Sequence, residues 1–226
     1  MSISNNLHHI KSTLPNKVTL VAVSKTKPIT QLMEAYNAGQ RIFGENKIQE
    51  MTEKWEQMPK DIQWHMIGHV QSNKVKYMAE YVHLIHGVDS LKLLQEIDKQ
   101  AKKHNRIIHC LLQVHIAEEE TKFGLSTDEL QEIISLLLEN SNLNNVKVIG
   151  LMGMATFTDN QHIIKKEFDC LKSIFDQYQH ISSPIFQLET LSMGMSNDYR
   201  LAIECGSTMI RIGSSIFGDR NYNIKP

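Results

Sequence analysis

The chain has 226 residues, 41% of them hydrophobic and 22% charged, with a formal net charge of −1 at pH 7. This composition is typical of a folded globular protein and argues against an intrinsically disordered chain. The balanced charge argues against a nucleic-acid-binding protein, which usually carries a basic excess. No apolar run approaches the ~18 residues that a membrane span requires, and the N-terminus lacks the basic and apolar regions of a signal peptide. We therefore expect a cytoplasmic protein without nucleic-acid or membrane partners.

The pattern along the chain predicts alternating strands and helices. An extra helix is expected first, over residues 5–14. Eight short β-like segments follow, each before a segment with helical spacing of apolar residues: 18–24, 41–44, 62–68, 82–88, 107–115, 146–153, 185–193 and 208–213. Several are almost continuously apolar, as parallel strands buried on both faces are. Eight such units over this length favour one domain, residues 1–226, folded as a (β/α)₈ TIM-type barrel with the extra helix covering its bottom or side.

Two helical segments carry distinctive local signals. Ser126 and Glu129 have the spacing of a capping box, which predicts a helix beginning there. Further on, apolar residues recur every three or four positions, which predicts a helix with one face on the core. These residues are Ile164, Phe168, Leu171, Phe175 and Tyr178.

The cysteines give no sign of a metal site or a disulfide framework. Cys110, Cys170 and Cys205 are odd in number, widely spaced and outside any CxxC pair. This usage is typical of reduced thiols in a cytosolic protein. We therefore expect no metal.

Candidate chemistry should lie at the carboxyl ends of the strands, where barrel active sites are built. Lys25 follows the first strand. If Ser24 is the last residue facing outward, Lys25 faces the barrel opening. A lysine in such a partly desolvated place can have a lowered pKa and attack a carbonyl group, although a solvated surface lysine is the alternative.

The second and third strands end in polar residues of less certain role. Asn46 could contact a ligand at the barrel opening, or it could cap the next helix. His65 and His69 could act as general bases, but a single histidine is more often a hydrogen-bonded structural group. Their spacing resembles a helical zinc motif, yet they fall on a strand and a turn with no third ligand.

The ends of the last two strands favour a phosphate site. In barrels the loops after strands seven and eight commonly bind phosphate through backbone amides. Ser196, Gly213, Ser214 and Ser215 are small or hydroxyl-bearing residues that suit such a site, and Arg211 lies between these two groups. A lysine at strand one and a phosphate site at strands seven and eight form a joint pattern, which a Schiff-base aldolase acting on a sugar phosphate would also show.

The same segments closely resemble the pyridoxal phosphate homeostasis protein family. The similar motifs are VAVSKTKP at 21–28, FGEN at 43–46, WHMIGHVQSNK at 64–74, GLMGMAT at 150–156, LSMGMSND at 191–198 and GSTMIRIGSSIFGDR at 206–220. The resemblance covers nearly the whole chain. Mild departures occur at Lys47, Val70 and His115, where an aromatic residue, Leu and Asn are common.

The resemblance implies a barrel that binds pyridoxal 5′-phosphate (PLP) and is related to the N-terminal domain of alanine racemases. It implies that Lys25 holds PLP as an aldimine, a Schiff base. It further implies that Arg211 faces the pyridine nitrogen. The remaining implied contacts are Ser196, Gly213 and Ser214 to the phosphate, and Asn46 and Met154 to the ring.

The resemblance favours a non-enzymatic role in intracellular PLP homeostasis, as a carrier or buffer. A PLP-dependent amino-acid racemase is the alternative. Arg211 would disfavour a protonated pyridine nitrogen, although alanine racemases tolerate this arrangement, so Arg211 alone does not exclude catalysis. The heavier reason is that racemisation needs an acid/base group on each face of the substrate. In the racemase-like fold the second group comes from a further C-terminal domain, which we expect this chain to lack. No catalytic residue is therefore assigned. We expect a monomer, with PLP as ligand and apo PLP-dependent enzymes as candidate protein partners.

Overall fold

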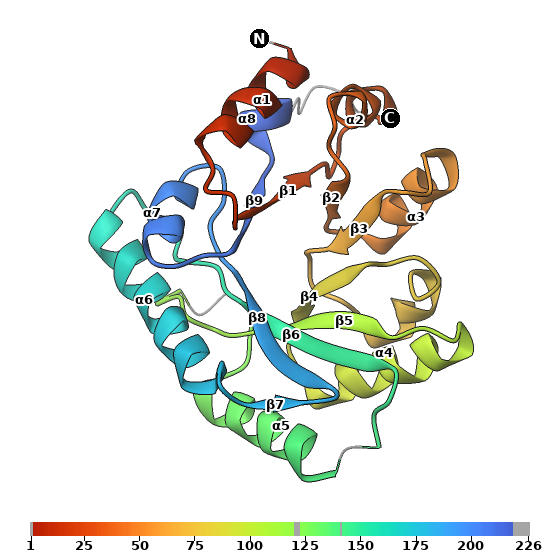
Figure 1. Ribbon diagram of the computed structural model, residues 1–226, viewed down its shortest axis with the longest axis vertical. Helices are drawn as coiled ribbons and strands as arrows, with labels where there is room; N and C mark the ends of the chain where they lie inside the picture. Colours follow the sequence, from red (N-terminus) through yellow and green to blue (C-terminus); the bar gives the residue numbers. More distant parts are fainter. Residues whose placement is uncertain (1, 120–122, 141, 219–226) are drawn as a thin grey trace.

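The computed structural model describes residues 2–119, 123–140 and 142–218. Eight parallel strands close into a barrel, and helices surround it (Figure 1). The strands of the barrel are β1 (Thr19–Val23), β2 (Ile42–Glu45), β3 (Gln63–Met66), β4 (Leu84–Val88), β5 (Ile108–Gln113), β6 (Val146–Met152), β8 (Phe186–Ser192) and β9 (Met209–Ile212). Neighbours along the chain pair around the barrel, and β9 pairs with β1 to complete the circle. The predicted barrel and all eight predicted strands are confirmed.

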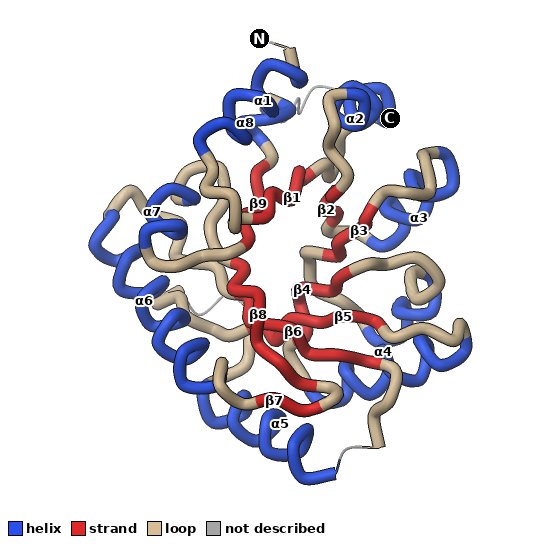
Figure 2. Tube along the Cα trace, viewed as in Figure 1, coloured by secondary structure: helices blue, strands red, loops and turns tan. Residues whose placement is uncertain are grey.

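The helices surround the barrel on its outside (Figure 2); α1 precedes β1, α8 follows β9, and the others connect strands. They are α1 (Ile3–Thr13), α2 (Ile29–Asn37), α3 (Ile48–Gln57), α4 (Leu91–Lys103), α5 (Thr127–Asn140), α6 (Gln161–Tyr178), α7 (Tyr199–Glu204) and α8 (Ser214–Phe217). No helix within the described ranges is long and apolar enough to cross a membrane.

Two short elements differ from the prediction. The segment after β3 forms a 3₁₀ helix, η1 (Ser72–Tyr77), instead of an α-helix. Its neighbourhood buries Val75 and Met78 at a spacing of three residues, which suits the three-residue turn of a 3₁₀ helix. A two-residue strand, β7 (Ser182–Ser183), pairs antiparallel with β8 outside the barrel.

The barrel buries apolar side chains on both sides of its wall. A small cluster in the interior contains Val21, Leu84, Leu111, Met152 and Met209. The main core lies between the strands and the helices, and it includes the whole apolar stripe predicted for α6. Burial on both sides explains why the strand sequences are nearly continuously apolar.

The local signals hold as predicted. The Ser126 amide donates to Glu129 Oε2 over 2.8 Å, and the Glu129 amide donates to Ser126 Oγ over 3.2 Å. These reciprocal bonds form the capping box at the start of α5. The expected N-terminal helix is α1, which lies against α2 and α8 near the amino end of β1.

Candidate cofactor site

Lys25 lies in the turn after β1, at the carboxyl end of the barrel, and is half-buried. Its neighbour Ser24 is buried, and its Oγ donates a hydrogen bond to the carboxylate of Glu45, which lies on the helix-facing side of β2. Ser24 therefore faces outward, as the prediction for Lys25 required. Lys27 points elsewhere, because its Nζ donates to the carbonyl groups of Phe217 and Gly218 over 3.2 and 2.9 Å.

Asn46 and Met154 follow β2 and β6 at the same end of the barrel. Asn46 does not cap α3, whose N-cap is Lys47. Its Oδ1 is buried and has no hydrogen-bond partner among the described residues. Met154 is partly buried against the interior cluster. A buried amide oxygen without a partner is unusual in folded proteins, so Asn46 has hydrogen-bonding capacity left for a ligand.

The loops after β8 and β9 meet through Ser196 and Gly213. Ser196 Oγ accepts a hydrogen bond from the Gly213 amide over 3.3 Å. A Cβ atom on Gly213 would lie 3.2 Å from the Val23 carbonyl oxygen, so this loop also packs closely on the end of β1. Ser214 is exposed and begins α8, where its amide has no acceptor within the helix. Ser196, Gly213 and Ser214 thus lie together beside the turn that carries Lys25.

Arg211 lies on β9 with its side chain buried inside the barrel. Its guanidinium donates to Ser192 O over 2.9 Å, to Ser192 Oγ over 2.6 Å and to Gly153 O over 3.1 Å. These bonds connect β9 with the ends of β8 and β6. Burial lowers the pKa of Arg211 to about 10, an effect that the nearby Asp198 carboxylate opposes. The group therefore remains a cation near neutral pH.

A chain of polar side chains extends from Arg211 across the barrel interior. Ser192 Oγ lies 3.2 Å from His86 Nδ1, and His86 Nε2 lies 3.1 Å from His65 Nδ1. Burial lowers the pKa of His65 to about 3 and that of His86 well below its ordinary value. Both rings are therefore neutral and serve as hydrogen-bonding groups. His65 is therefore a hydrogen-bonded structural group, the alternative stated for it above, and no motif pointed to His86. His69 bonds Asp89 over 3.0 Å at the surface.

A buried ion pair, Glu45 with Lys54, lies behind Lys25 and was not predicted from the sequence. Glu45, at the end of β2, is fully buried, and its Oε1 lies 2.8 Å from Lys54 Nζ on α3. Burial raises the pKa of Glu45 to about 7, although the ammonium of Lys54 opposes the rise. The FGEN motif was the available signal, because a glutamate that ends a buried strand needs a partner.

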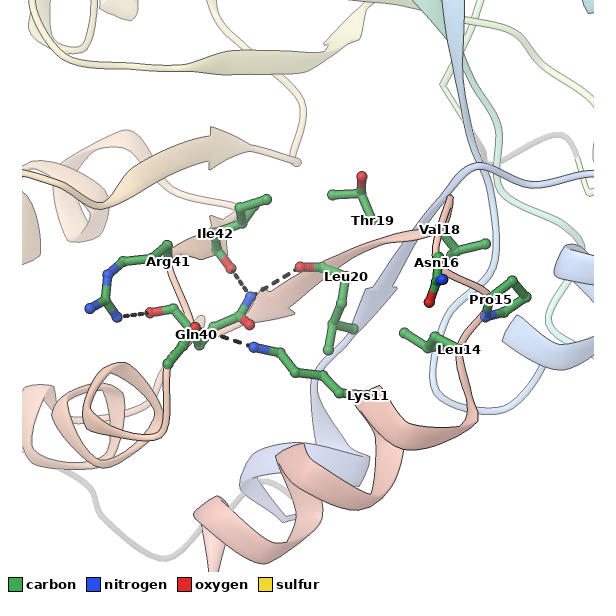
Figure 3. Close-up of a pocket in the computed structure, with 11 residues that line it drawn as sticks. Lys11, Leu14, Pro15, Asn16, Val18, Thr19, Leu20, Gln40, Arg41 and Ile42 are labelled. Carbon is green, nitrogen blue, oxygen red and sulfur yellow. Dashed lines mark hydrogen bonds between the residues drawn. The ribbon is translucent and has the colours of Figure 1, made fainter.

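Two cavities lie at the opposite, amino end of the barrel. One, of about 370 Å³, lies where α1 approaches the first two strands and is lined by Lys11, Gln40 and Arg41 among others (Figure 3). The other, of about 170 Å³, is lined by His65, His83 and His109 at the amino ends of β3 to β5. The described residues bring no group of three His, Cys, Asp or Glu side chains into an arrangement that could hold a metal. Neither cavity adjoins Lys25.

Comparison with known proteins supports the resemblance noted from the motifs. A family model described as the N-terminal domain of alanine racemase matches residues 1–221. The pyridoxal phosphate homeostasis protein of Aquifex aeolicus is 40% identical over 208 residues, which cover 92% of this chain and 89% of that protein. The chain belongs to this family. The protein of the same name from Haemophilus influenzae is 37% identical and covers 99% of this chain and 98% of its own length.

Solved structures agree with the sequence relatives. PipY of Synechococcus elongatus PCC7942, solved with PLP bound, superimposes with a TM-score of 0.87 at 35% identity and covers 96% of this chain and 100% of its own. The alanine racemase of Streptomyces lavendulae has a TM-score of 0.80 at 14% identity, and the match covers 57% of that enzyme. The likeness to the racemase is therefore one of fold.

Proposed function

We propose that this protein binds PLP through Lys25 and acts in PLP homeostasis as a carrier or buffer. The observation that supports it best is that Lys25, Asn46, Ser196, Gly213 and Ser214 gather at one end of a barrel whose fold matches PipY with PLP bound. PLP supplies an aldehyde that reacts with amines and a conjugated ring that absorbs visible light when it has reacted.

The residues present fit such a ligand. Asn46 Oδ1 has no partner within the described part of the chain, so it can accept a hydrogen bond from a ring substituent. Ser196 and Ser214 offer hydroxyl groups, and Gly213 lets the backbone approach closely. The buried guanidinium of Arg211 can donate to an unprotonated ring nitrogen, since arginine has only donors.

Lys25→Ala tests the covalent bond. The wild-type protein loaded with PLP should show a visible absorption band, and borohydride should fix one PLP to the chain, measured by intact-protein mass. Lys25→Ala should lose both signals. Lys27→Ala is the matched control and should keep both, because the Lys27 ammonium is directed at the end of α8. Undiminished trapping in Lys25→Ala would show that another lysine carries PLP.

We further propose that the protein, as a carrier, does not turn over amino acids. The Haemophilus influenzae relative, which is matched over 98% of its length, is named a pyridoxal phosphate homeostasis protein, and PipY, matched over 100% of its length, was solved with PLP bound. Arg211 opposes protonation of the ring nitrogen and so weakens stabilisation of a carbanion. No α-proton of L-alanine should exchange with deuterium oxide faster than with free PLP, as followed by NMR. Faster exchange that disappears in Lys25→Ala would support a racemase-type enzyme instead.

The proposal extends to the protein's surroundings. We infer a cytoplasmic monomer that gives up PLP to apo PLP-dependent enzymes. The exposure of the site supports the transfer of PLP, since Lys25 is half-buried and Ser214 and Ser215 are exposed. Such an opening leaves bound PLP accessible to an acceptor.

A further inference from the structure

Three charged side chains form a buried group directly behind the turn that carries Lys25. Lys54, on α3, is 5% exposed, and its Nζ lies 2.8 Å from Glu45 Oε1 and 2.7 Å from Glu50 Oε1. Glu45 is fully buried, whereas Glu50 is partly exposed one turn before Lys54 on the same helix. We call Glu45, Glu50 and Lys54 the Lys54 clamp.

The clamp bonds the residue on each side of Lys25. Before it, Ser24 Oγ donates to Glu45 Oε1 over 2.5 Å, and the Ser24 carbonyl accepts from Lys54 Nζ over 2.9 Å. After it, the Thr26 amide donates to Glu50 Oε1 over 2.6 Å. The backbone on both sides of Lys25 is therefore tied to one group of charges.

The backbone that the clamp holds is strained. Thr26 has a φ of +63°, a left-handed conformation that β-branched residues avoid. Such conformations persist only where the surroundings enforce them, and they gather at functional sites. Two contacts hold Thr26 in this conformation: the Lys27 amide closes the turn by donating to the Ser24 carbonyl over 3.1 Å, and the Thr26 amide donates to Glu50. The strained residue is therefore Thr26, whose backbone conformation sets the direction of the chain directly after Lys25.

Stability alone gives a weak reason for this clamp. A buried ion pair commonly stabilises a fold no better than apolar side chains of the same size. Here the cost of burying the Glu45 carboxylate is not fully offset by hydrogen bonds, because its Oε2 has no partner among the described residues. The arrangement is better explained by the geometry that it imposes on the turn.

We propose that the Lys54 clamp is the positioning device for Lys25, presenting its amine to the aldehyde of PLP. Glu45, Glu50 and Lys54 are positioning residues, since they act through Ser24 and Thr26 and do not touch the ligand. This inference rests on the proposed function and adds to it how the lysine is held. It requires that loss of the clamp slow the bond-forming step, in which Lys25 Nζ bonds the aldehyde carbon and water leaves, without weakening non-covalent binding.

The test separates these two events in the full-length protein. The rate of covalent capture is followed by the rise of the visible band after PLP is mixed with protein freed of ligand by hydroxylamine. Non-covalent binding is measured by calorimetry with pyridoxine 5′-phosphate, whose alcohol group cannot bond to an amine. Glu50→Ala is the main variant, because its partly exposed site makes folding robust, and circular dichroism checks that the barrel is intact. Glu53→Ala, at an exposed position on the same helix, is the matched control.

Glu50→Ala should slow capture by about tenfold, since a misplacement of ~1 Å can cost up to ~100-fold in rate. Its affinity for pyridoxine 5′-phosphate should equal that of the wild type. Glu50→Gln keeps an oxygen acceptor for the Thr26 amide and should recover most of the rate, and Glu53→Ala should behave as the wild type.

Two results would overturn the inference while leaving the proposed function intact. One is capture by Glu50→Ala at the wild-type rate. The other is an equal loss of capture and of pyridoxine 5′-phosphate affinity, which would indicate general damage to the site. By contrast, absence of capture in the wild type, or full capture by Lys25→Ala, would refute the proposed function itself.

Discussion

The buried guanidinium of Arg211 should contribute measurably to the stability of the barrel before any ligand binds. Arg211→Met keeps most of the side-chain length and removes every donor. The backbone carbonyls of Ser192 and Gly153 then lose the guanidinium donors that they have at 2.9 and 3.1 Å, although the Ser192 carbonyl still accepts from the Gly153 amide over 3.1 Å. Ser192 Oγ also loses its 2.6 Å bond but keeps His86 Nδ1 at 3.2 Å.

The magnitude follows from these contacts. A buried acceptor left without a partner costs ~1–3 kcal/mol, and this cost falls on the Gly153 carbonyl because the Ser192 carbonyl keeps the Gly153 amide. The variant no longer has to desolvate a cation, which offsets part of the loss. We expect a net destabilisation of about 1–2 kcal/mol. Arg211→Lys keeps the charge but has a single nitrogen, so it should fall between the wild type and Arg211→Met.

The assay is urea unfolding of the ligand-free protein, followed by both circular dichroism and tryptophan fluorescence so that coincident transitions can be verified. Arg200→Met is the matched control, because Arg200 is exposed on α7, and it should unfold like the wild type. If Arg211→Met were as stable as Arg200→Met, the three hydrogen bonds would not hold the ends of β6, β8 and β9 together, and our account of the barrel interior would be wrong.

Two further predictions concern the phosphate contacts and pH. Ser196→Asp should weaken binding of PLP by about tenfold or more, since like charges at ~4 Å repel strongly, and should weaken binding of unphosphorylated pyridoxal far less; equal losses would place the phosphate elsewhere. Burial raises the pKa of Glu45 to about 7 from an ordinary 4.5. As pH rises, the Glu45 carboxyl group therefore stays protonated to a higher pH in the folded state than in the unfolded state. The stability of the wild type relative to Glu45→Gln should therefore fall as pH rises from 5 to 8 in unfolding experiments, and a constant difference would contradict the raised pKa.

The barrel architecture and the turn at Lys25 could be predicted from the order of residues along the chain. Nearly continuous apolar strands alternating with amphipathic helices can bury both faces of a sheet only in a few ways, and eight repeats made the closed barrel the expected one. Glycine and serine in the last two loops indicated where the backbone could approach a phosphate. The capping box at Ser126 and Glu129 was readable because both partners lie within one helical turn.

Which polar side chains meet inside the barrel and behind its wall could not be predicted in this way, because it depends on how the chain folds. Arg211, Ser192 and His86 lie on three different strands, and Glu45 and Lys54 lie on a strand and a helix. Nothing in the spacing of these residues along the chain encodes their contact, because barrel register and helix packing bring them together. Burial then sets their charges, lowering the pKa values of the interior histidines and raising that of Glu45. Desolvation depends on every neighbour in space, so such shifts follow only from the folded molecule.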